Sequence, residues 1–285
     1  MIAIIANPNA LHFNVQNLRN IKNCLEQSGL KTDIFFTQRA KDGTKIANLI
    51  KNHYDIIASY GGDGIVNEVI NAKLPDSASF AVIPAGTTNV LSIELGIKSY
   101  SNAVEAIKNK KTKKAYICDI DGKKFILMAG IGFDAEAVLN VNEKLKKISG
   151  KFSYVLSGAT SYLKKSSYEE IEVEINKKRY RALWVIASNA ERYAGSFRIS
   201  RSINIFHKTM DISVFKSANR FLSLPFYNLF LFSGMHSFSR RIQHIKTDRM
   251  KIITKNIPIQ IDGDFYGYSP CEISILEKPI NIIVP

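Results

Sequence analysis

The fold of this chain is decided by one stretch, Asp55-Ile56-Ile57-Ala58-Ser59-Tyr60-Gly61-Gly62-Asp63-Gly64-Ile65-Val66-Asn67-Glu68-Val69-Ile70. Its first part is a short apolar run typical of a buried strand, and its last part repeats apolar residues on one helix face. A strand, a glycine turn and a helix start therefore follow one another. Such a turn directs backbone N–H groups from the positive end of a helix toward phosphate oxygens, and its glycines let the backbone approach a ligand closely.

The aspartate in this turn needs a separate explanation, because an acid in a phosphate cradle repels phosphates. Asp63 is expected either to hold Mg²⁺ or to face a hydroxyl group that becomes phosphorylated. The alternative interpretation is a tight strand–helix turn in which Asp63 only caps a helix.

Two further strands end in polar loops. The run 79–83 leads into Pro84-Ala85-Gly86-Thr87-Thr88-Asn89, and the run 2–6 leads into Asn7-Pro8-Asn9-Ala10. Parallel α/β sheets place their ligand sites outside the carboxyl ends of the strands. We therefore expect the three loops to converge on one crevice.

The rest of the chain indicates two domains. Residues 1–115 alternate strands and helices, which is typical of a parallel sheet covered by helices. The lysine-rich stretch 108–114 is interpreted as a hinge, and residues 116–277 are expected to form an antiparallel β-sandwich. The expected first-domain strands are 2–6, 31–37, 55–60 and 79–83, with helices at 14–28, 43–53, 65–74, 88–95 and 101–108. The expected second-domain strands include 169–175, 181–187, 210–215 and 251–254, interrupted by a helix near 150–165.

These segments, taken in order, resemble the diacylglycerol kinase catalytic-domain family, which includes bacterial lipid kinases and is related to sphingosine and ceramide kinases. The resemblance rests on the three loops together with Gly130-Ile131-Gly132-Phe133-Asp134-Ala135, Ser188-Asn189 with 193–197, and Ile261-Asp262-Gly263-Asp264. It implies an α/β nucleotide-binding domain like that of NAD kinases and phosphofructokinases at 1–115. It also implies that segment 278–285 returns to that domain and that 116–277 binds the lipid substrate.

The resemblance further implies roles for individual residues. Asp63 would hold Mg²⁺ through ATP and act in catalysis, and Asp264 would be the catalytic base beside Asp262 in the cleft. A simple hairpin turn at 261–264 is the alternative, because Asp-Gly favours such turns. Residues implied to bind ATP are Asn7, Thr37, Gly61, Gly62, Asp63, Gly64, Asn67, Glu68, Gly86, Thr87 and Asn89.

Four positions depart from the family pattern. Ile65 replaces a threonine of the phosphate loop, Val90 replaces an acid of the magnesium network, and Asp264 replaces a glutamate. His207 replaces an aspartate of a structural Mg²⁺ site in the second domain. Because Mg²⁺ prefers oxygen ligands, that structural site is expected to be lost or altered.

Composition and charge limit which partners the protein is expected to have. The net charge of +14 favours transient contact with an anionic membrane surface, and no nucleic-acid-binding module accompanies it. No apolar run of about 18 residues predicts a transmembrane helix. Three widely spaced cysteines are interpreted as free thiols, which fits a reducing compartment. The predicted location is therefore cytoplasmic and peripheral to the membrane.

The sequence thus predicts an ATP-dependent lipid kinase that transfers the γ-phosphoryl group to a diacylglycerol or sphingoid hydroxyl. The alternatives are a non-catalytic module that binds a lipid or nucleotide, and a small-molecule kinase such as an NAD kinase. A homodimer is an open alternative for the oligomeric state. The apolar lipid slot is expected to include Phe226, Leu229, Phe230 and Phe232.

Overall fold

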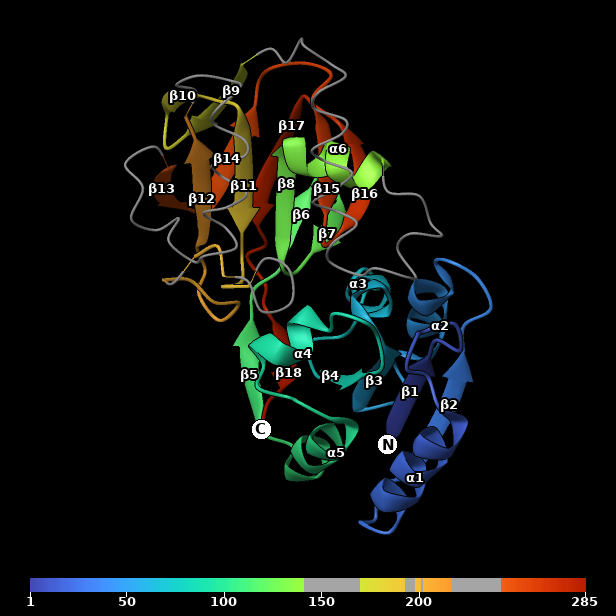
Figure 1. Cartoon of the computed structure of the whole chain (residues 1–285). Helices are drawn as coiled ribbons and strands as arrows, with labels where there is room; N and C mark the ends of the chain where they lie inside the picture. The colour runs from blue at the N-terminus through green and yellow to red at the C-terminus, as the bar shows by residue number, and fades with distance from the viewer. Residues whose placement is uncertain (141–169, 193–197, 201, 217–241) are drawn as a thin grey trace. The chain divides into compact units, whose positions relative to one another are not determined.

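The computed structural model describes residues 1–140, 170–192, 198–200, 202–216 and 242–285, and it divides the chain into two compact units (Figure 1). Unit 1 comprises residues 1–116 and 277–285, and unit 2 comprises residues 117–276. The sequence prediction placed the first domain at residues 1–115 with 278–285, and the second at 116–277. The predicted helix near 150–165, segment 193–197 and the four apolar residues between 226 and 232 lie outside the described residues.

Unit 1 is built on a six-stranded sheet with the strand order β2-β1-β3-β4-β18-β5. Every neighbouring pair is parallel except β18 with β5. The expected parallel α/β architecture is therefore confirmed. The strands are β1 (Ile2–Ala6), β2 (Thr32–Phe36), β3 (Ile56–Gly61), β4 (Ser79–Pro84), β5 (Thr112–Ala115) and β18 (Ile280–Ile283).

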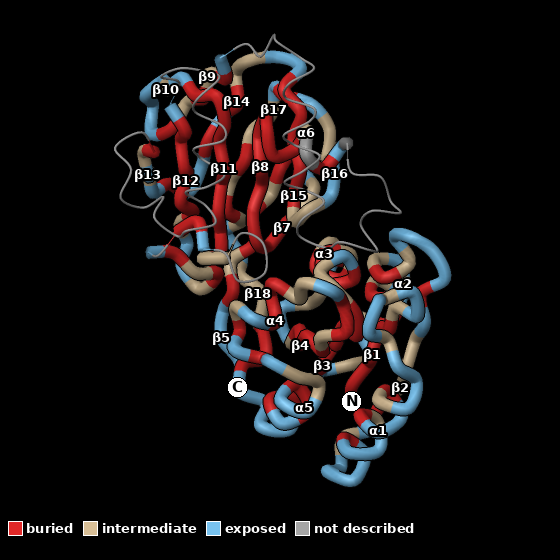
Figure 2. The backbone as a smooth tube through the Cα atoms, in the orientation of Figure 1, coloured by how far each residue is buried: buried red, intermediate tan, exposed pale blue. Residues whose placement is uncertain are grey.

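Helices cover both faces of this sheet, as right-handed crossovers between parallel strands require. Helix α1 packs against α5, whereas α2 packs against α3. Every residue of β1 and β3 is buried, as Figure 2 shows, which explains why these strands read as continuous apolar runs. The helices are α1 (Val15–Glu26), α2 (Asp42–Ile50), α3 (Asp63–Ile70), α4 (Val90–Glu94) and α5 (Tyr100–Asn109).

The carboxyl ends of the four consecutive strands β1 to β4 lie level with one another. Ala6 pairs with both Phe36 and Tyr60, and Gly61 pairs with Pro84. Backbone hydrogen bonds continue this register into the loops, since the N–H of Ala85 donates to the carbonyl of Gly61 at 2.8 Å. One edge of the sheet therefore gathers the loops that follow all four strands.

The interpretation of residues 108–114 as a hinge was wrong. Lys108 belongs to α5, and Lys113 and Lys114 lie on β5, which pairs with β18 at the edge of the sheet. Three of the four β5 residues are exposed. An edge strand commonly carries lysines, so its composition resembles that of a linker.

Unit 2 contains two six-stranded antiparallel sheets, which confirms the expected class of the second domain. Sheet B has the order β10-β9-β14-β17-β6-β7, and sheet C has the order β13-β12-β11-β8-β15-β16. The strands of sheet B are β6 (Cys118–Ile120), β7 (Lys123–Phe125), β9 (Ile171–Ile175), β10 (Lys178–Ala182), β14 (Arg249–Ile252) and β17 (Cys271–Ile275). Those of sheet C are β8 (Met128–Gly132), β11 (Trp184–Ser188), β12 (Met210–Phe215), β13 (Ile242–Thr247), β15 (Pro258–Ile261) and β16 (Asp264–Tyr268).

Two details of unit 2 differ from the sequence prediction. The run 181–187 was expected to be one strand, but β10 ends at Ala182 and β11 begins at Trp184, because the chain passes from sheet B to sheet C between them. A helix also follows β8 directly, namely α6 (Phe133–Asn140). Sequence analysis treated the start of this helix only as part of a motif.

Candidate functional site

The loops after β3 and β4 touch through two glycines. The Cα atom of Gly62 would lie 2.3 Å from a Cβ atom added to Gly86, and the latter glycine is buried. Any larger residue at position 86 would push the two loops apart. The glycine turn is therefore in close contact with the loop that carries Thr87 and Asn89.

Asp63 joins the same two loops through its side chain. Its Oδ2 atom accepts hydrogen bonds from the Thr88 hydroxyl and the Val90 N–H, both at 3.0 Å, and its Oδ1 atom accepts one from the Leu91 N–H at 3.2 Å. These amides form the first turn of α4, where backbone N–H groups lack partners within the helix. Asp63, which begins α3, thus caps the neighbouring helix α4.

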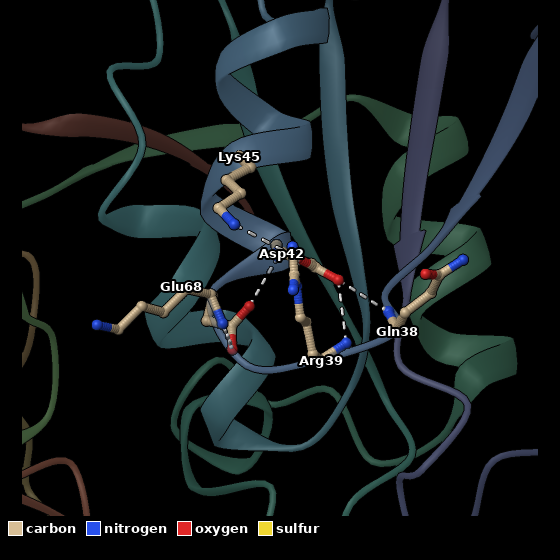
Figure 3. A network of polar contacts seen from close by, with 7 residues as sticks. Gln38, Arg39, Asp42, Lys45 and Glu68 are labelled. Carbon is tan, nitrogen blue, oxygen red and sulfur yellow. Dashed lines mark hydrogen bonds and ion pairs between the residues drawn. The ribbon is translucent and has the colours of Figure 1, made fainter.

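Glu68 caps the N-terminus of α2 in the same way that Asp63 caps α4 (Figure 3). Its Oε1 atom accepts the Lys41 N–H at 2.9 Å, and its Oε2 atom accepts the Gly43 N–H at 2.7 Å. The Thr44 hydroxyl donates to the Glu68 carbonyl at 2.6 Å. Glu68 was predicted to bind ATP, but its carboxylate is directed to the positive end of α2.

A second carboxylate shapes the chain before α2 (Figure 3). Asp42 accepts hydrogen bonds from the backbone N–H groups of Arg39 and Gln38, at 3.0 and 3.1 Å. These backbone donors, with smaller contributions from the positive charges of Arg39 and Lys45, hold the pKa of Asp42 below its ordinary value. The loop between β2 and α2 is thus ordered by two acids, Asp42 and Glu68.

Helix α3 differs from its neighbours because no side chain among the described residues caps its N-terminus. Asn14 and Ser99 cap α1 and α5 with their side chains, whereas Gly62 offers α3 no side-chain cap. Gly64, in the first turn, is exposed and has open space beside its Cα atom. Thr87, on the adjoining loop, is exposed too, and its hydroxyl makes no hydrogen bond in unit 1, whose residues the structure describes in full.

The other predicted ATP-binding side chains in unit 1 hold the loops in shape. Asn89 closes its loop with two hydrogen bonds to Gly86, at 2.7 and 2.8 Å. Asn7 accepts the Asn9 N–H at 2.9 Å, and the Thr37 hydroxyl donates to the Ala6 carbonyl at 3.4 Å. Asn67 is buried and accepts from Asn71 at 3.1 Å. Any ligand at this edge would therefore meet mainly main-chain N–H groups and Thr87.

The predicted catalytic segment of unit 2 is a hairpin that joins β15 to β16. Asp262 and Gly263 form its two-residue turn with φ angles of +49° and +91°, as Asp-Gly turns of this kind require. The Asp262 carboxylate accepts N–H groups from Ile126, Leu127 and Met128, at 2.9 to 3.0 Å. The alternative interpretation of a hairpin thus describes the local structure, and Asp262 anchors it.

Asp264 follows this turn and is exposed. Its carboxylate makes no hydrogen bond or ion pair with the residues that the structure describes. Asp264 belongs to unit 2 and Asp63 to unit 1. Their cooperation in one site stays a prediction.

Two buried polar residues, Asp134 and Gln260, were not among the predicted site residues, although Asp134 lies in the motif 130–135. The sequence signal available for Asp134 was an acid in the first turn of a helix that follows a glycine-rich strand.

At the expected altered metal site, His207 is exposed. The Oδ2 atom of the buried Asp211 lies 2.9 Å from Nδ1 of His244. Across the described ranges, no three His, Cys, Asp or Glu side chains converge as a metal site.

Two family models match the chain. Residues 1–120 match the diacylglycerol kinase catalytic domain, and residues 127–284 match the YegS C-terminal NAD kinase beta sandwich-like domain. The second match alone covers more than half of the sequence. The first match covers residues 1–116 of unit 1, and the second covers most of unit 2 together with β18 of unit 1.

Curated relatives and solved structures agree with these matches. A diacylglycerol kinase of Bacillus subtilis is 27% identical over 95% of this chain and 91% of its own, and one of Staphylococcus epidermidis is 25% identical over 92% and 84%. A crystal structure from Bacillus anthracis, provisionally named a diacylglycerol kinase, superposes with a TM-score of 0.83 at 23% identity. That alignment covers all of this chain and 95% of the other, and it supports the fold. No helix among the described residues is long and apolar enough to cross a bilayer.

The Glu68→Gln variant tests the cap of α2. A glutamine offers one acceptor oxygen, so its NH₂ group would face one of the two backbone N–H groups without accepting its proton. We expect the free energy of unfolding to fall by about 1–3 kcal/mol, measured by urea denaturation. The exposed Glu105 on α5 supplies the matched control, Glu105→Gln. Equal stability of the two variants would contradict the capping role.

The lowered pKa of Asp42 predicts a pH-dependent stability. A carboxyl group with a lower pKa in the folded chain stabilises it fully above its ordinary pKa of 3.8, and this stabilisation is lost as pH falls through the folded value. Asp42→Asn should therefore have a lower Tm than wild type at pH 7, and the gap should narrow below pH 3.8. Asp248→Asn, an exposed control, should show no such gap. A gap for Asp42→Asn that persists unchanged in acid would refute the charge argument.

Proposed function

Because the chain belongs to the family defined by the diacylglycerol kinase catalytic domain, we propose that it is an ATP-dependent lipid kinase. It transfers the γ-phosphoryl group to a hydroxyl of a diacylglycerol-type or sphingoid-type lipid. The family and the relatives named diacylglycerol kinase support kinase activity on a lipid. The single structural observation that carries the proposal is the open N-terminus of α3.

The ATP phosphates bind over this N-terminus. Main-chain N–H groups of the first helical turn and the positive end of the helix dipole favour negative charge there. Asp63 and Glu68 close the N-termini of α4 and α2, so these helices offer no competing sites. Gly64 leaves room for the phosphates, and the free Thr87 hydroxyl donates to one of their oxygens.

Asp63 is the residue suited to a magnesium ion that arrives with the nucleotide. An ionised carboxylate has about four acceptor positions, and three of those on Asp63 are used by Thr88, Val90 and Leu91. One protein carboxylate together with substrate phosphates is a common ligand set for Mg²⁺. When bound, the ion supplies positive charge that offsets the charge of the transferring phosphoryl group.

Asp264 accepts the proton of the lipid hydroxyl as its oxygen forms a bond to the γ-phosphorus. The bond between that phosphorus and the β,γ-bridging oxygen breaks, and ADP leaves. Asp264 is exposed, and its carboxylate makes no hydrogen bond with the residues that the structure describes, which supports this role. General bases of this kind contribute roughly 10²–10⁴-fold to a rate.

Radiolabelled phosphate transfer tests the activity. Wild type with labelled ATP and Mg²⁺ is expected to label diacylglycerol or a sphingoid base presented in vesicles. Asp264→Asn should lower kcat by about 10²–10⁴-fold, because the amide cannot take the proton. Asp248→Asn, an exposed aspartate elsewhere in unit 2, should keep wild-type activity.

The assay separates the three candidate functions. When NAD is added as a second acceptor, labelled NADP with unlabelled lipid would identify a small-molecule kinase. ATP binding without a labelled product would identify a non-catalytic module. Full activity of Asp264→Asn would refute the assigned base while leaving the lipid kinase in place.

We also propose that a basic surface brings the protein to the cytoplasmic face of an anionic membrane. Five exposed lysines lie on α5, on β5 and in the connection between them, namely Lys108, Lys110, Lys111, Lys113 and Lys114, and Lys111 also donates to the Pro285 carbonyl at 3.0 Å. No acidic residue lies between Glu105 and Asp119. The basic residues of β10 are less available, because Arg179 and Arg181 pair with Glu172 and Glu170. The five lysines define the basic cluster of unit 1.

Vesicle sedimentation tests this cluster. Each lysine near an anionic surface contributes roughly 1 kcal/mol, so Lys108→Gln with Lys114→Gln should weaken binding about thirtyfold and reduce its salt dependence. Lys177→Gln with Lys178→Gln removes the same charge from the start of β10 and the residue before it, and should have a smaller effect. Binding that is independent of salt, or an equal loss in both double variants, would contradict the assignment.

A further inference from the structure

Two buried polar side chains of unit 2 connect α6 to the hairpin that carries Asp264. Asp134, in the first turn of α6, is 7% exposed, and Gln260 on β15 is fully buried. The Asp134 Oδ2 atom accepts a hydrogen bond from Nε2 of Gln260. Neither residue has a part in the proposed chemistry, although Asp134 lies in a motif that the sequence singled out.

The other end of the Gln260 amide reaches the hairpin turn. Its Oε1 atom accepts the Gly263 N–H at 2.8 Å. A carboxylate accepts and a backbone N–H donates, so these two partners determine which way the amide faces. A continuous path of hydrogen bonds thus runs from α6 through Gln260 to the residue just before Asp264.

A second anchor acts on the same turn. The Asp262 carboxylate binds three consecutive backbone N–H groups, those of Ile126, Leu127 and Met128. Both turn residues are therefore held, Asp262 by its side chain and Gly263 by its N–H. The next side chain, that of Asp264, remains exposed and unbonded among the described residues.

Gly130 on β8 provides the space for this path. A Cβ atom at this position would meet Oδ2 of Asp134 at only 1.8 Å and Nε2 of Gln260 at 2.7 Å. The two side chains therefore meet directly over the backbone of a residue that has no side chain of its own. A glycine on a buried central strand is otherwise unfavourable, which marks this position as one where close approach matters.

We propose that Asp134 and Gln260 are positioning residues that fix the hairpin and thereby aim the Asp264 carboxylate. This proposal rests on the proposed function, in which Asp264 is the base. A base must come within about 2.6–3.2 Å of the proton that it accepts, and aspartate has a shorter reach than glutamate. A misplacement of about 1 Å can cost roughly 10²-fold in rate, so a short side chain depends strongly on its backbone.

The Gln260→Met variant removes both hydrogen bonds at nearly constant volume. We expect kcat to fall about 10- to 100-fold while KM for ATP is unchanged, because the nucleotide site lies on other residues. Asp134→Ala removes the acceptor and should behave similarly. Asp134→Asn keeps an acceptor oxygen for Gln260 and should retain more activity than Asp134→Ala.

A double-mutant cycle distinguishes positioning from a merely structural role. If Gln260 acts through Asp264, Gln260→Met should have little further effect on kcat in the Asp264→Asn background. The same fold-loss in both backgrounds would overturn the proposal. Wild-type kcat for Gln260→Met would overturn it as well.

Amide hydrogen exchange supplies a readout that needs no kinase activity. Gln260→Met should speed exchange of the Gly263 N–H at least tenfold in the intact protein, whereas Asp248→Asn should not. Unchanged exchange at Gly263 would overturn the hydrogen-bond path itself. A third outcome is that the wild-type protein phosphorylates no lipid while Gln260→Met still speeds exchange of the Gly263 N–H. This outcome would refute the proposed function and the positioning of Asp264 as a base. It would still support the hydrogen bond that anchors the hairpin.

Discussion

Unit 1 depends on the two acids of α3 and the helix ends that they close. Asp63 accepts two backbone N–H groups of α4, and Glu68 accepts two near the start of α2. Carboxylates are favoured at helix N-termini by direct hydrogen bonds and by the helix dipole. Because α3 caps both neighbours and has no side-chain cap among the described residues, its positive end is left open at this edge of the sheet within that part of the chain. The arrangement both holds the loops together and selects the place where an anion can bind.

Two departures from the family pattern, Ile65 and Val90, can be explained by where these side chains lie. Ile65 is 3% exposed, so its apolar side chain belongs to the core beneath the turn. Val90 is 5% exposed, and its backbone N–H serves Asp63. With no acid at position 90, Asp63 is the carboxylate nearest the open helix end in this network. In the proposed kinase, main-chain N–H groups, Thr87 and a single acid would therefore bind the nucleotide.

In unit 2 a carboxylate also accepts several backbone N–H groups, but it holds a turn and not a helix N-terminus. Asp262 accepts three successive backbone N–H groups, much as Asp63 does, and it immobilises a turn rather than a helix. The hairpin and catalytic interpretations of residues 261–264 are therefore compatible. The turn provides a rigid support, and the Asp264 carboxylate beside it has no hydrogen-bond partner among the described residues. Preorganisation of this kind is what a short acidic side chain needs in order to act as a base.

The sequence by itself determined the two domain classes and the identity of the loops, because periodicity and Gly, Asn and Asp turn chemistry are local properties. It also indicated Asp264 and the glycine turn as candidate site residues. Only the tertiary structure decided what most of those side chains bind. Glu68 meets residues 25 and 27 positions away, and Gln260 meets Asp134 across 126 positions. Strand β5 was misread for the same reason, since its lysines form a strand only when β18 returns from the end of the chain to pair with them. Hydrogen-bond partners that are distant in sequence leave no periodic signal, so the fold has to bring them together before their roles can be seen.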